Sequence, residues 1–258
     1  MKQILIIPDK QEIENSVALA KNYGAGFEYN DFVQSDVLDD EGSLQQIISA
    51  YKTTDLPEYC TLHGAFFDVL PFSVDQRIRQ IADLRIRQSV QSAKQMGAKA
   101  VVFHTNYNPF LNSKDYLDNW IATNAVYWSN VLEQNQEINI YLENMFDLTP
   151  DVLKQLSERL CQYKNFGVCL DYAHAFLSKT APAEWAKCLG QFVKHVHIND
   201  NDGISDLHLA WGDGIIHKEE FYNSYKEYLS GASVVIETSG YENKVKSLQR
   251  LEQDGFFD

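Results

Sequence analysis

Eight short apolar runs recur along the chain, about 20 to 40 residues apart, and a helix-like or loop segment follows each of them. Strands that alternate with helices are typical of a parallel sheet, because a parallel crossover needs a long connection. Eight such units in a chain of 258 residues are what a (β/α)8 TIM barrel requires. The runs span residues 4–8, 26–30, 60–64, 100–104, 138–144, 167–171, 194–200 and 233–238.

An open doubly wound sheet is the alternative to the barrel. If it bound a dinucleotide, it would normally carry a glycine-rich phosphate turn after the first strand. The segment Ile7-Pro8-Asp9-Lys10 contains no glycine. No linker rich in Pro, Gly or Ser divides the chain, so we expect one barrel domain over residues 1–258.

Two connecting helices have recognisable ends. Ser73 is a candidate cap for a helix that runs to about Met96, with Gly97 just past its end. Thr149 and Pro150 suggest a cap and a first helical position. One face of the first helix carries apolar residues near helical spacing, namely Val74, Ile78, Ile81 and Leu84.

Ionisable side chains stand at the ends of several runs, on the parity opposite to the aliphatic residues. In residues 138–143, Ile140 and Leu142 share one parity and Glu143 has the other. Helices cover the outer face of a barrel, so we expect the ionisable parity to point into its mouth. The same pattern holds for Asp171, His197 and Glu237.

Taken singly, each of these residues is an ordinary polar group at a strand end. Together they suggest more, because buried carboxylates are costly unless they are paired or bind metal. Three carboxylates and several imidazoles at one mouth predict a divalent metal site. Such ligands suit Mn²⁺, Mg²⁺, Co²⁺ or Zn²⁺ and do not select among them.

Two stretches near the seventh run, residues 194–203 and 206–215, resemble the signature of xylose isomerase-like barrels. That superfamily includes sugar (phosphate) isomerases and epimerases, hydroxypyruvate isomerase, inosose dehydratase and endonuclease IV. The resemblance also covers Leu62-His63-Gly64, Phe103-His104, Leu142-Glu143-Asn144, Leu170-Asp171-Tyr172-Ala173-His174 and Ile236-Glu237-Thr238.

The resemblance implies two possible metal sites. In isomerases and epimerases one metal is held by residues that match Glu143, Asp171, His197 and Glu237, and the two Glu residues are also the acid/base pair. Endonuclease IV binds three zinc ions, and its larger ligand set adds positions that match His63, His104, His174, Asp206 and His208. This chain has a ligand-type residue at all nine positions, so both metal counts remain open.

For the isomerase, we expect His63 and His174 to bind substrate hydroxyls, and His195 to lie deeper as a structural residue. Glu28 is either a substrate contact or an ion-paired residue at the rim. Trp211 is a candidate substrate contact among aromatic residues that either wall the mouth or pack against the barrel top. These aromatics are Phe66, Phe67, Tyr107, Phe110, Phe146, Tyr172 and Trp211.

Charge bears on the choice of partner. The net charge is −14, no basic run occurs, and residues 30–42 hold five carboxylates without a Lys or Arg. Nucleic acids are bound through Lys and Arg, and an acidic rim would repel their phosphates, so nucleic acid and anionic membrane surfaces are disfavoured as partners.

No apolar run reaches about 18 residues, the length that a membrane-spanning helix needs. The cysteines form no CxxC pair, which suggests reduced thiols in a cytoplasmic protein.

We therefore predict a metal-dependent isomerase or epimerase of a small sugar or related polyhydroxy carbonyl compound. Its reaction would pass through a metal-stabilised cis-enediolate, with Glu143 and Glu237 moving the proton. The alternative is a hydrolase or lyase of endonuclease IV type with three zinc ions. A third possibility is a non-catalytic barrel that retains its metal. The resemblance also implies a possible homo-oligomer.

Overall fold

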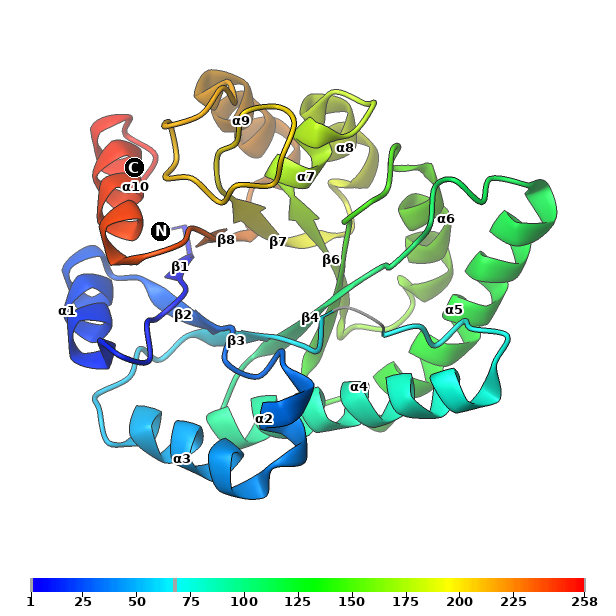
Figure 1. Ribbon diagram of the computed structural model, residues 1–258. Helices are drawn as coiled ribbons and strands as arrows, with labels where there is room; N and C mark the ends of the chain where they lie inside the picture. The colour runs from blue at the N-terminus through cyan, green and yellow to red at the C-terminus, as the bar shows by residue number, and fades with distance from the viewer. Residues whose placement is uncertain (1, 67–68, 258) are drawn as a thin grey trace.

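The computed structural model describes residues 2–66 and 69–257, and within them eight parallel strands close into a barrel in chain order (Figure 1). Pairing of the first strand with the last closes the ring. The predicted (β/α)8 TIM barrel is therefore confirmed. The strands are β1 (Ile4–Ile6), β2 (Gly26–Tyr29), β3 (Cys60–His63), β4 (Ala100–His104), β5 (Asn139–Glu143), β6 (Phe166–Asp171), β7 (Val193–Ile198) and β8 (Ser233–Ile236).

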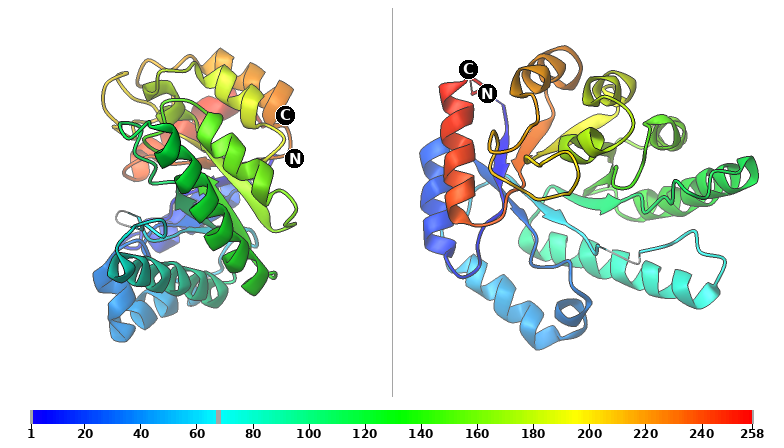
Figure 2. Two further views of the ribbon diagram at one scale, coloured as in Figure 1. Left: turned by 90° about the vertical axis from the view of Figure 1, so that its right-hand side faces the viewer. Right: turned by 45° about the horizontal axis from the view of Figure 1, so that its top comes forward.

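Helices connect the strands and lie around the outside of the barrel, as the two views in Figure 2 show. The helical elements are α1 (Ile13–Tyr23), α2 (Ser35–Asp39), α3 (Glu41–Lys52), α4 (Gln76–Met96), α5 (Lys114–Gln134), α6 (Asp151–Leu160), α7 (Tyr172–Leu177), α8 (Pro182–Leu189), α9 (Lys218–Ser224), η1 (Tyr225–Leu229) and α10 (Tyr241–Gln253). The helix before β8, α9, continues directly into a short π-helical turn, η1.

Among the described residues, buried apolar side chains form one large cluster and one small cluster. The large cluster includes Ile140, Leu142 and Ile236, the parity of the strands that faces the helices. A small cluster inside the barrel consists of Ala100, Val102, Tyr141 and Cys169. The predicted alternation is therefore confirmed, and the upper barrel interior is left to polar side chains.

Both predicted helix starts are displaced by one or two residues. Helix α4 is capped by Asp75 rather than Ser73, because the Asp75 carboxylate accepts a hydrogen bond from the N–H of Arg77 at 2.7 Å. Gly97 ends α4 in the left-handed conformation, as predicted. Helix α6 begins one residue later than predicted, with Pro150 as its cap position.

The predicted apolar face of α4 does not pack on the barrel. Ala82, Ile86, Val90 and Ala93 are buried instead, on the face of α4 that meets β3 and β4. The four residues of the predicted face are exposed, with exposed fractions of 94% for Val74, 40% for Ile78, 55% for Ile81 and 43% for Leu84.

The acidic segment of residues 30–42 uses several of its carboxylates to hold the fold. Asp39 pairs with Arg85 at 2.7 Å, and Asp40 caps α3 by accepting a hydrogen bond from Gly42 at 3.0 Å. The hydroxyl of Tyr51 donates to Asp31 at 2.5 Å. These carboxylates are therefore not free rim charges. In the described part of the chain, no helix is both long and apolar enough to cross a membrane.

Candidate metal centre

Four side chains from neighbouring strand ends meet at the mouth of the barrel. Glu143 ends β5, Asp171 ends β6, His197 lies in β7 and Glu237 follows β8. Each offers one ligand atom, and these atoms all lie within 4.8 Å of one another. Nδ1 of His197 is 3.3 Å from a Glu143 oxygen and 3.1 Å from a Glu237 oxygen. The structure thus brings together all four residues predicted as ligands of a single metal.

This group has the unsatisfied atoms that a cation would bind. Both Glu143 oxygens, Oδ2 of Asp171, Nδ1 of His197 and Oε2 of Glu237 are buried and have no hydrogen-bond partner among the described residues. Burial raises the pKa of Asp171 to about 7, and the Glu237 and Glu143 charges add to the effect. Carboxylate and imidazole ligands suit Mn²⁺, Mg²⁺, Co²⁺ or Zn²⁺, so these residues fit a divalent metal.

A second group adjoins the first through Glu143. Nε2 of His63 and Nε2 of His104 each lie 3.4 Å from Oε2 of Glu143. Nδ1 of His63 lies 3.0 Å from the Gly64 carbonyl. If Nδ1 donates its proton there, the Nε2 lone pair of His63 faces Glu143, which is the orientation of a metal ligand.

A third group consists of His174, Asp206 and His208. Oδ2 of Asp206 lies 3.3 Å from Nε2 of His174 and 3.0 Å from Nε2 of His208. Nδ1 of His174 lies 2.9 Å from the Asn144 carbonyl, and Nδ1 of His208 lies 2.8 Å from the Glu237 carbonyl. Both rings thus present Nε2 to one carboxylate, as ligands of a further cation would.

The loop that carries Asp206 and His208 is held by a buried carboxylate that the sequence reasoning missed. Asp200 accepts hydrogen bonds from the N–H groups of Gly212 at 2.9 Å and Ile216 at 3.0 Å. A Cβ at Gly214 would lie 2.4 Å from Oδ1 of Asp200, so the close approach requires glycine. His208 has a φ of +48°, an uncommon conformation that this loop maintains at the site.

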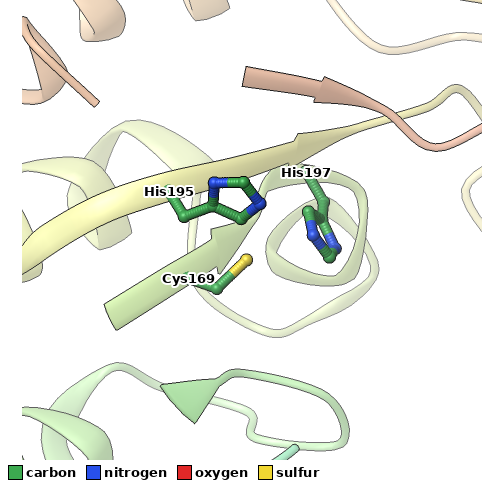
Figure 3. A group of neighbouring side chains, drawn as sticks. All are labelled: Cys169, His195 and His197. Atoms are coloured by element: carbon green, nitrogen blue, oxygen red, sulfur yellow. The ribbon is translucent and has the colours of Figure 1, made fainter. Parts of the chain in front are cut away.

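Beneath the metal centre lies a buried polar layer around Glu28. Oε2 of Glu28 accepts a hydrogen bond from Thr61 at 2.8 Å and lies 2.9 Å from Nε2 of His195. Oε1 of Glu28 lies 2.8 Å from Nε2 of His197. Figure 3 shows both imidazoles projecting from β7 with the Cys169 thiol pointing toward them. Burial raises the pKa of Cys169 well above its usual range, so this thiol stays protonated.

Two of the predicted substrate contacts lie away from the mouth. Glu28 is fully buried, so its predicted ion pairing exists but not at the rim. Trp211 is also fully buried, and its indole N–H donates to the Tyr222 hydroxyl at 3.1 Å. His195 lies deep in the barrel, as predicted, with Nδ1 2.6 Å from the Ser233 hydroxyl.

Two cavities adjoin the metal centre. A cavity of about 880 Å³ lies beyond the ends of β3 to β6 and reaches the centre at His174 and Asp206. A cavity of about 540 Å³ lies beyond β1, β2 and β8 and reaches it at Glu237 and His208. Of the predicted mouth aromatics, Tyr107, Phe110 and Phe146 line the larger cavity, Phe66 lines the smaller, Tyr172 and Trp211 are buried in the core, and Phe67 lies outside the described residues.

Asp147 is a second carboxylate that the sequence reasoning missed. It lines the larger cavity and is buried, and its Oδ2 accepts hydrogen bonds from Thr105 at 2.7 Å and from the N–H of Met145 at 3.2 Å. Burial raises the pKa of Asp147 to about 6. Its only signal in the sequence is an acidic residue within an otherwise apolar loop, where strand alternation no longer applies.

Known proteins of related sequence place this geometry in context. A family model described as a xylose isomerase-like TIM barrel matches residues 17–254. The uncharacterized protein MJ1311 of Methanocaldococcus jannaschii is 30% identical over 203 residues, which cover 74% of this chain and 68% of that protein. A probable endonuclease 4 of Mycobacterium leprae is 26% identical over 215 residues, which cover 76% of this chain and 79% of that protein.

Solved structures share the fold over nearly the whole chain. The TTHB071 protein of Thermus thermophilus, soaked with ZnCl2, is 22% identical with a TM-score of 0.78 and 99% coverage of both chains. A D-tagatose 3-epimerase-like protein is 24% identical with a TM-score of 0.78, covering 98% of this chain and 96% of the other. At these identities the likeness concerns the fold.

Proposed function

The chain belongs to the xylose isomerase-like TIM barrel family, and on that premise we propose that it is a divalent-metal-dependent isomerase or epimerase. Its substrate would be a sugar or a related polyhydroxy carbonyl compound. The observation that carries the proposal is a buried group of two glutamates, an aspartate and a histidine that lies beside two cavities of small-molecule size, one of which Glu237 lines. The fold similarity to a D-tagatose 3-epimerase-like protein supports it.

The two glutamates would move the proton. A divalent cation held by Glu143, Asp171, His197 and Glu237 would polarise a substrate carbonyl and make the neighbouring C–H acidic. Glu143 and Glu237 both lie beside Nδ1 of His197 and come from different strands. One carboxylate would remove the proton, and the other would return a proton to another carbon or to the opposite face.

His63 and His174 have a supporting role in this proposal. Each imidazole lies within 4 Å of a ligand carboxylate, at 3.4 Å for His63 to Glu143 and 3.7 Å for His174 to Asp171. When a single cation is bound, Nε2 of His63 would be available to bind a substrate hydroxyl group. Nε2 of His174 would bind one in place of its contact with Asp206. Burial excludes bulk water from this site, so such polar contacts are stronger than in water.

Solvent-hydrogen exchange tests the reaction without knowledge of the substrate stereocentre. Metal-loaded protein would be incubated with a panel of ketoses and aldoses in D2O, and deuterium at the carbon next to the carbonyl measured by NMR. We expect Glu143→Gln and Glu237→Gln each to slow exchange at least about 100-fold. Glu158→Gln, at an exposed helix position, is the control. Full activity in the Glu143→Gln variant would refute the mechanism.

A second candidate function follows from the two additional histidine groups. His63 and His104 with Glu143, and His174 and His208 with Asp206, provide ligands for further cations. A site of three zinc ions would favour hydrolysis of a phosphate ester, because clustered zinc ions generate hydroxide and neutralise phosphate charge. The similarity to a probable endonuclease 4 supports this alternative.

Metal content separates the two candidates. Protein purified without chelator or metal-affinity steps would be analysed for metal per chain. About one ion would support the isomerase or epimerase. Nearly three zinc ions, together with cleavage of duplex DNA that contains abasic sites, would favour the hydrolase and make all nine residues ligands.

A further inference from the structure

We propose that the larger cavity beside the metal centre is a subsite for a planar aromatic substituent of the substrate. The substrate class would then be a sugar that carries an aryl group, rather than a free sugar. For the sugar half, the inference rests on the proposed function. For the aryl half, it rests on the shape, lining and position of the cavity.

Several aromatic side chains line the cavity. Tyr107 packs against Trp120 with ring centroids 5.4 Å apart and against Tyr116 at 5.9 Å. Phe72 packs on Trp120 at 5.7 Å, so four rings form one continuous wall. Aromatic side chains favour stacked or edge-on contacts with another ring, which suits a planar ligand.

Exposed apolar side chains gather around the same cavity. Phe110 is 88% exposed, Phe146 is 54% exposed and Leu111 is 52% exposed, and all three line it. Scattered exposed apolar residues are normal, but a group around one hollow marks a binding surface. Among the described residues that line the cavity there is no Lys or Arg, so a neutral ring suits it better than an anion.

The cavity adjoins the metal centre. His174 and Asp206 line it, and Nδ1 of His174 lies 3.7 Å from both Oε1 of Glu143 and Oδ2 of Asp171. A single molecule could therefore place one group in the cavity while its sugar is held at the carboxylates. Its volume of about 880 Å³ exceeds the need of a single ring and is typical of ligand pockets.

The smaller cavity provides the place for the sugar itself. It reaches the metal centre at Glu237, on the opposite flank, and includes Asp9, Lys10, Asn30 and Lys244. The two cavities have no lining residue in common among those described. Hydroxyl groups suit the polar cavity and a ring suits the aromatic one, so a two-part substrate would span the centre between them.

Asp147 gives the aromatic cavity one polar contact. Its Oδ2 is satisfied by Thr105, whereas its buried Oδ1 has no hydrogen-bond partner among the described residues. A hydroxyl group on the aromatic ring could donate to this oxygen. A phenolic aryl group is therefore the form of substituent that the cavity suits best.

The test measures ring binding separately from catalysis. The neutral fluorescent probe N-phenyl-1-naphthylamine would be titrated into wild-type protein and into Phe110→Ser and Phe146→Ser, singly and together. Both side chains are largely exposed, so folding is expected to survive, and circular dichroism would verify it. Val126→Ser removes an apolar side chain that is 67% exposed and does not line the cavity, so it is the matched control.

We expect the double variant to bind the probe at least tenfold more weakly than wild type and Val126→Ser to bind it unchanged. Phenyl β-D-glucopyranoside should displace the probe at concentrations at least tenfold lower than methyl β-D-glucopyranoside, because only the former presents a ring. The proposal is overturned if the probe does not bind, if all variants bind it alike, or if the two glycosides compete equally.

These outcomes are distinct from those of the exchange assay. Ring preference without carbon–hydrogen exchange, either on free ketoses and aldoses or on carbonyl sugars that carry an aryl group, would leave the subsite standing and remove the isomerase or epimerase reaction. Exchange on free ketoses without ring preference would leave the reaction standing and remove the subsite. Chelator-treated protein should bind the fluorescent probe as tightly as metal-loaded protein does, because the ring contacts do not involve the cation. Loss of probe binding on chelation would contradict the proposed subsite.

Discussion

Glu28 on β2 faces His197 on β7 across the floor of the metal centre, with Oε1 of Glu28 2.8 Å from Nε2 of His197. The other ring nitrogen of His197, Nδ1, faces Glu143 and Glu237. Burial alone would raise the pKa of Glu28, but His197 and His195 hold it well below its usual range. An ionised Glu28 would therefore hold the His197 ring with Nδ1 toward the cation.

We predict that Glu28→Gln lowers metal affinity about 10- to 100-fold, the usual effect of losing a carboxylate behind a histidine ligand. Calorimetric titration of chelator-stripped protein with Mn²⁺ or Zn²⁺ would measure it. Glu158→Gln should leave the affinity unchanged. An unchanged affinity in a folded Glu28→Gln variant would contradict the positioning role.

The four primary ligand candidates could be found from sequence because strand alternation decides which side chains point inward. Glu143 opposes Ile140 and Leu142, and that parity is a local property of five residues. The eight-unit rhythm that predicts the barrel is similarly local. The inward direction of the ionisable side chains and the barrel fold can both be inferred where helices cover the outer face of the sheet.

Depth along the barrel could not be predicted in the same way. Glu28 lies near the end of its run, as Glu143 does in its own, but β2 pairs so that Glu28 lies opposite Thr61, two residues before His63. Strand stagger therefore places Glu28 one layer below the mouth. Asp147 and Trp211 lie in loops, where alternation gives no information. Both faces of α4 carry apolar residues, so the sequence alone does not decide which face meets the barrel.

Metal removal should destabilise the protein. The unsatisfied Glu143 and Asp171 oxygens lie close together in the buried centre, and a bound cation would offset their repulsion. We expect chelator to lower the melting temperature by roughly 5–10 °C, and added Mn²⁺ or Zn²⁺ to restore it. Differential scanning calorimetry would measure both. In Asp171→Asn the shift should shrink to less than half; a shift of full size would argue against this site.

Stability should depend on pH through Asp147. Its pKa rises from 3.8 to about 6 in the folded protein because it is buried, so the folded state binds more protons between those values. Stability from this group therefore falls as pH rises from 4 to 6 and stays low above that. Ionised Asp147 then costs up to about 3 kcal/mol.

Asp147→Asn removes that cost while keeping an oxygen that can accept from Thr105. We expect the variant to be more stable than wild type at pH 8 and to match it near pH 4, with urea unfolding of metal-free protein as the measurement. Asp118→Asn, on a largely exposed helix position, should show no such gain in stability at pH 8. A constant difference between Asp147→Asn and wild type across this range would show that burial does not shift the Asp147 pKa.

Trp211 tests whether burial outweighs the sequence-based expectation of a substrate contact. The indole is fully buried, donates to Tyr222 and packs edge-on against Phe221 with centroids 5.2 Å apart. Trp211→Phe should therefore cost about 1 to 3 kcal/mol of unfolding free energy, through a lost hydrogen bond and a small void. Urea unfolding would measure that cost, with the buried Trp128→Phe for comparison.

The Trp211 ring does not reach the mouth of the barrel. In Trp211→Phe, kcat and KM of the folded fraction should therefore stay within about twofold of wild type, a change of less than 0.5 kcal/mol. A tenfold rise in KM with unchanged stability would return Trp211 to the substrate site.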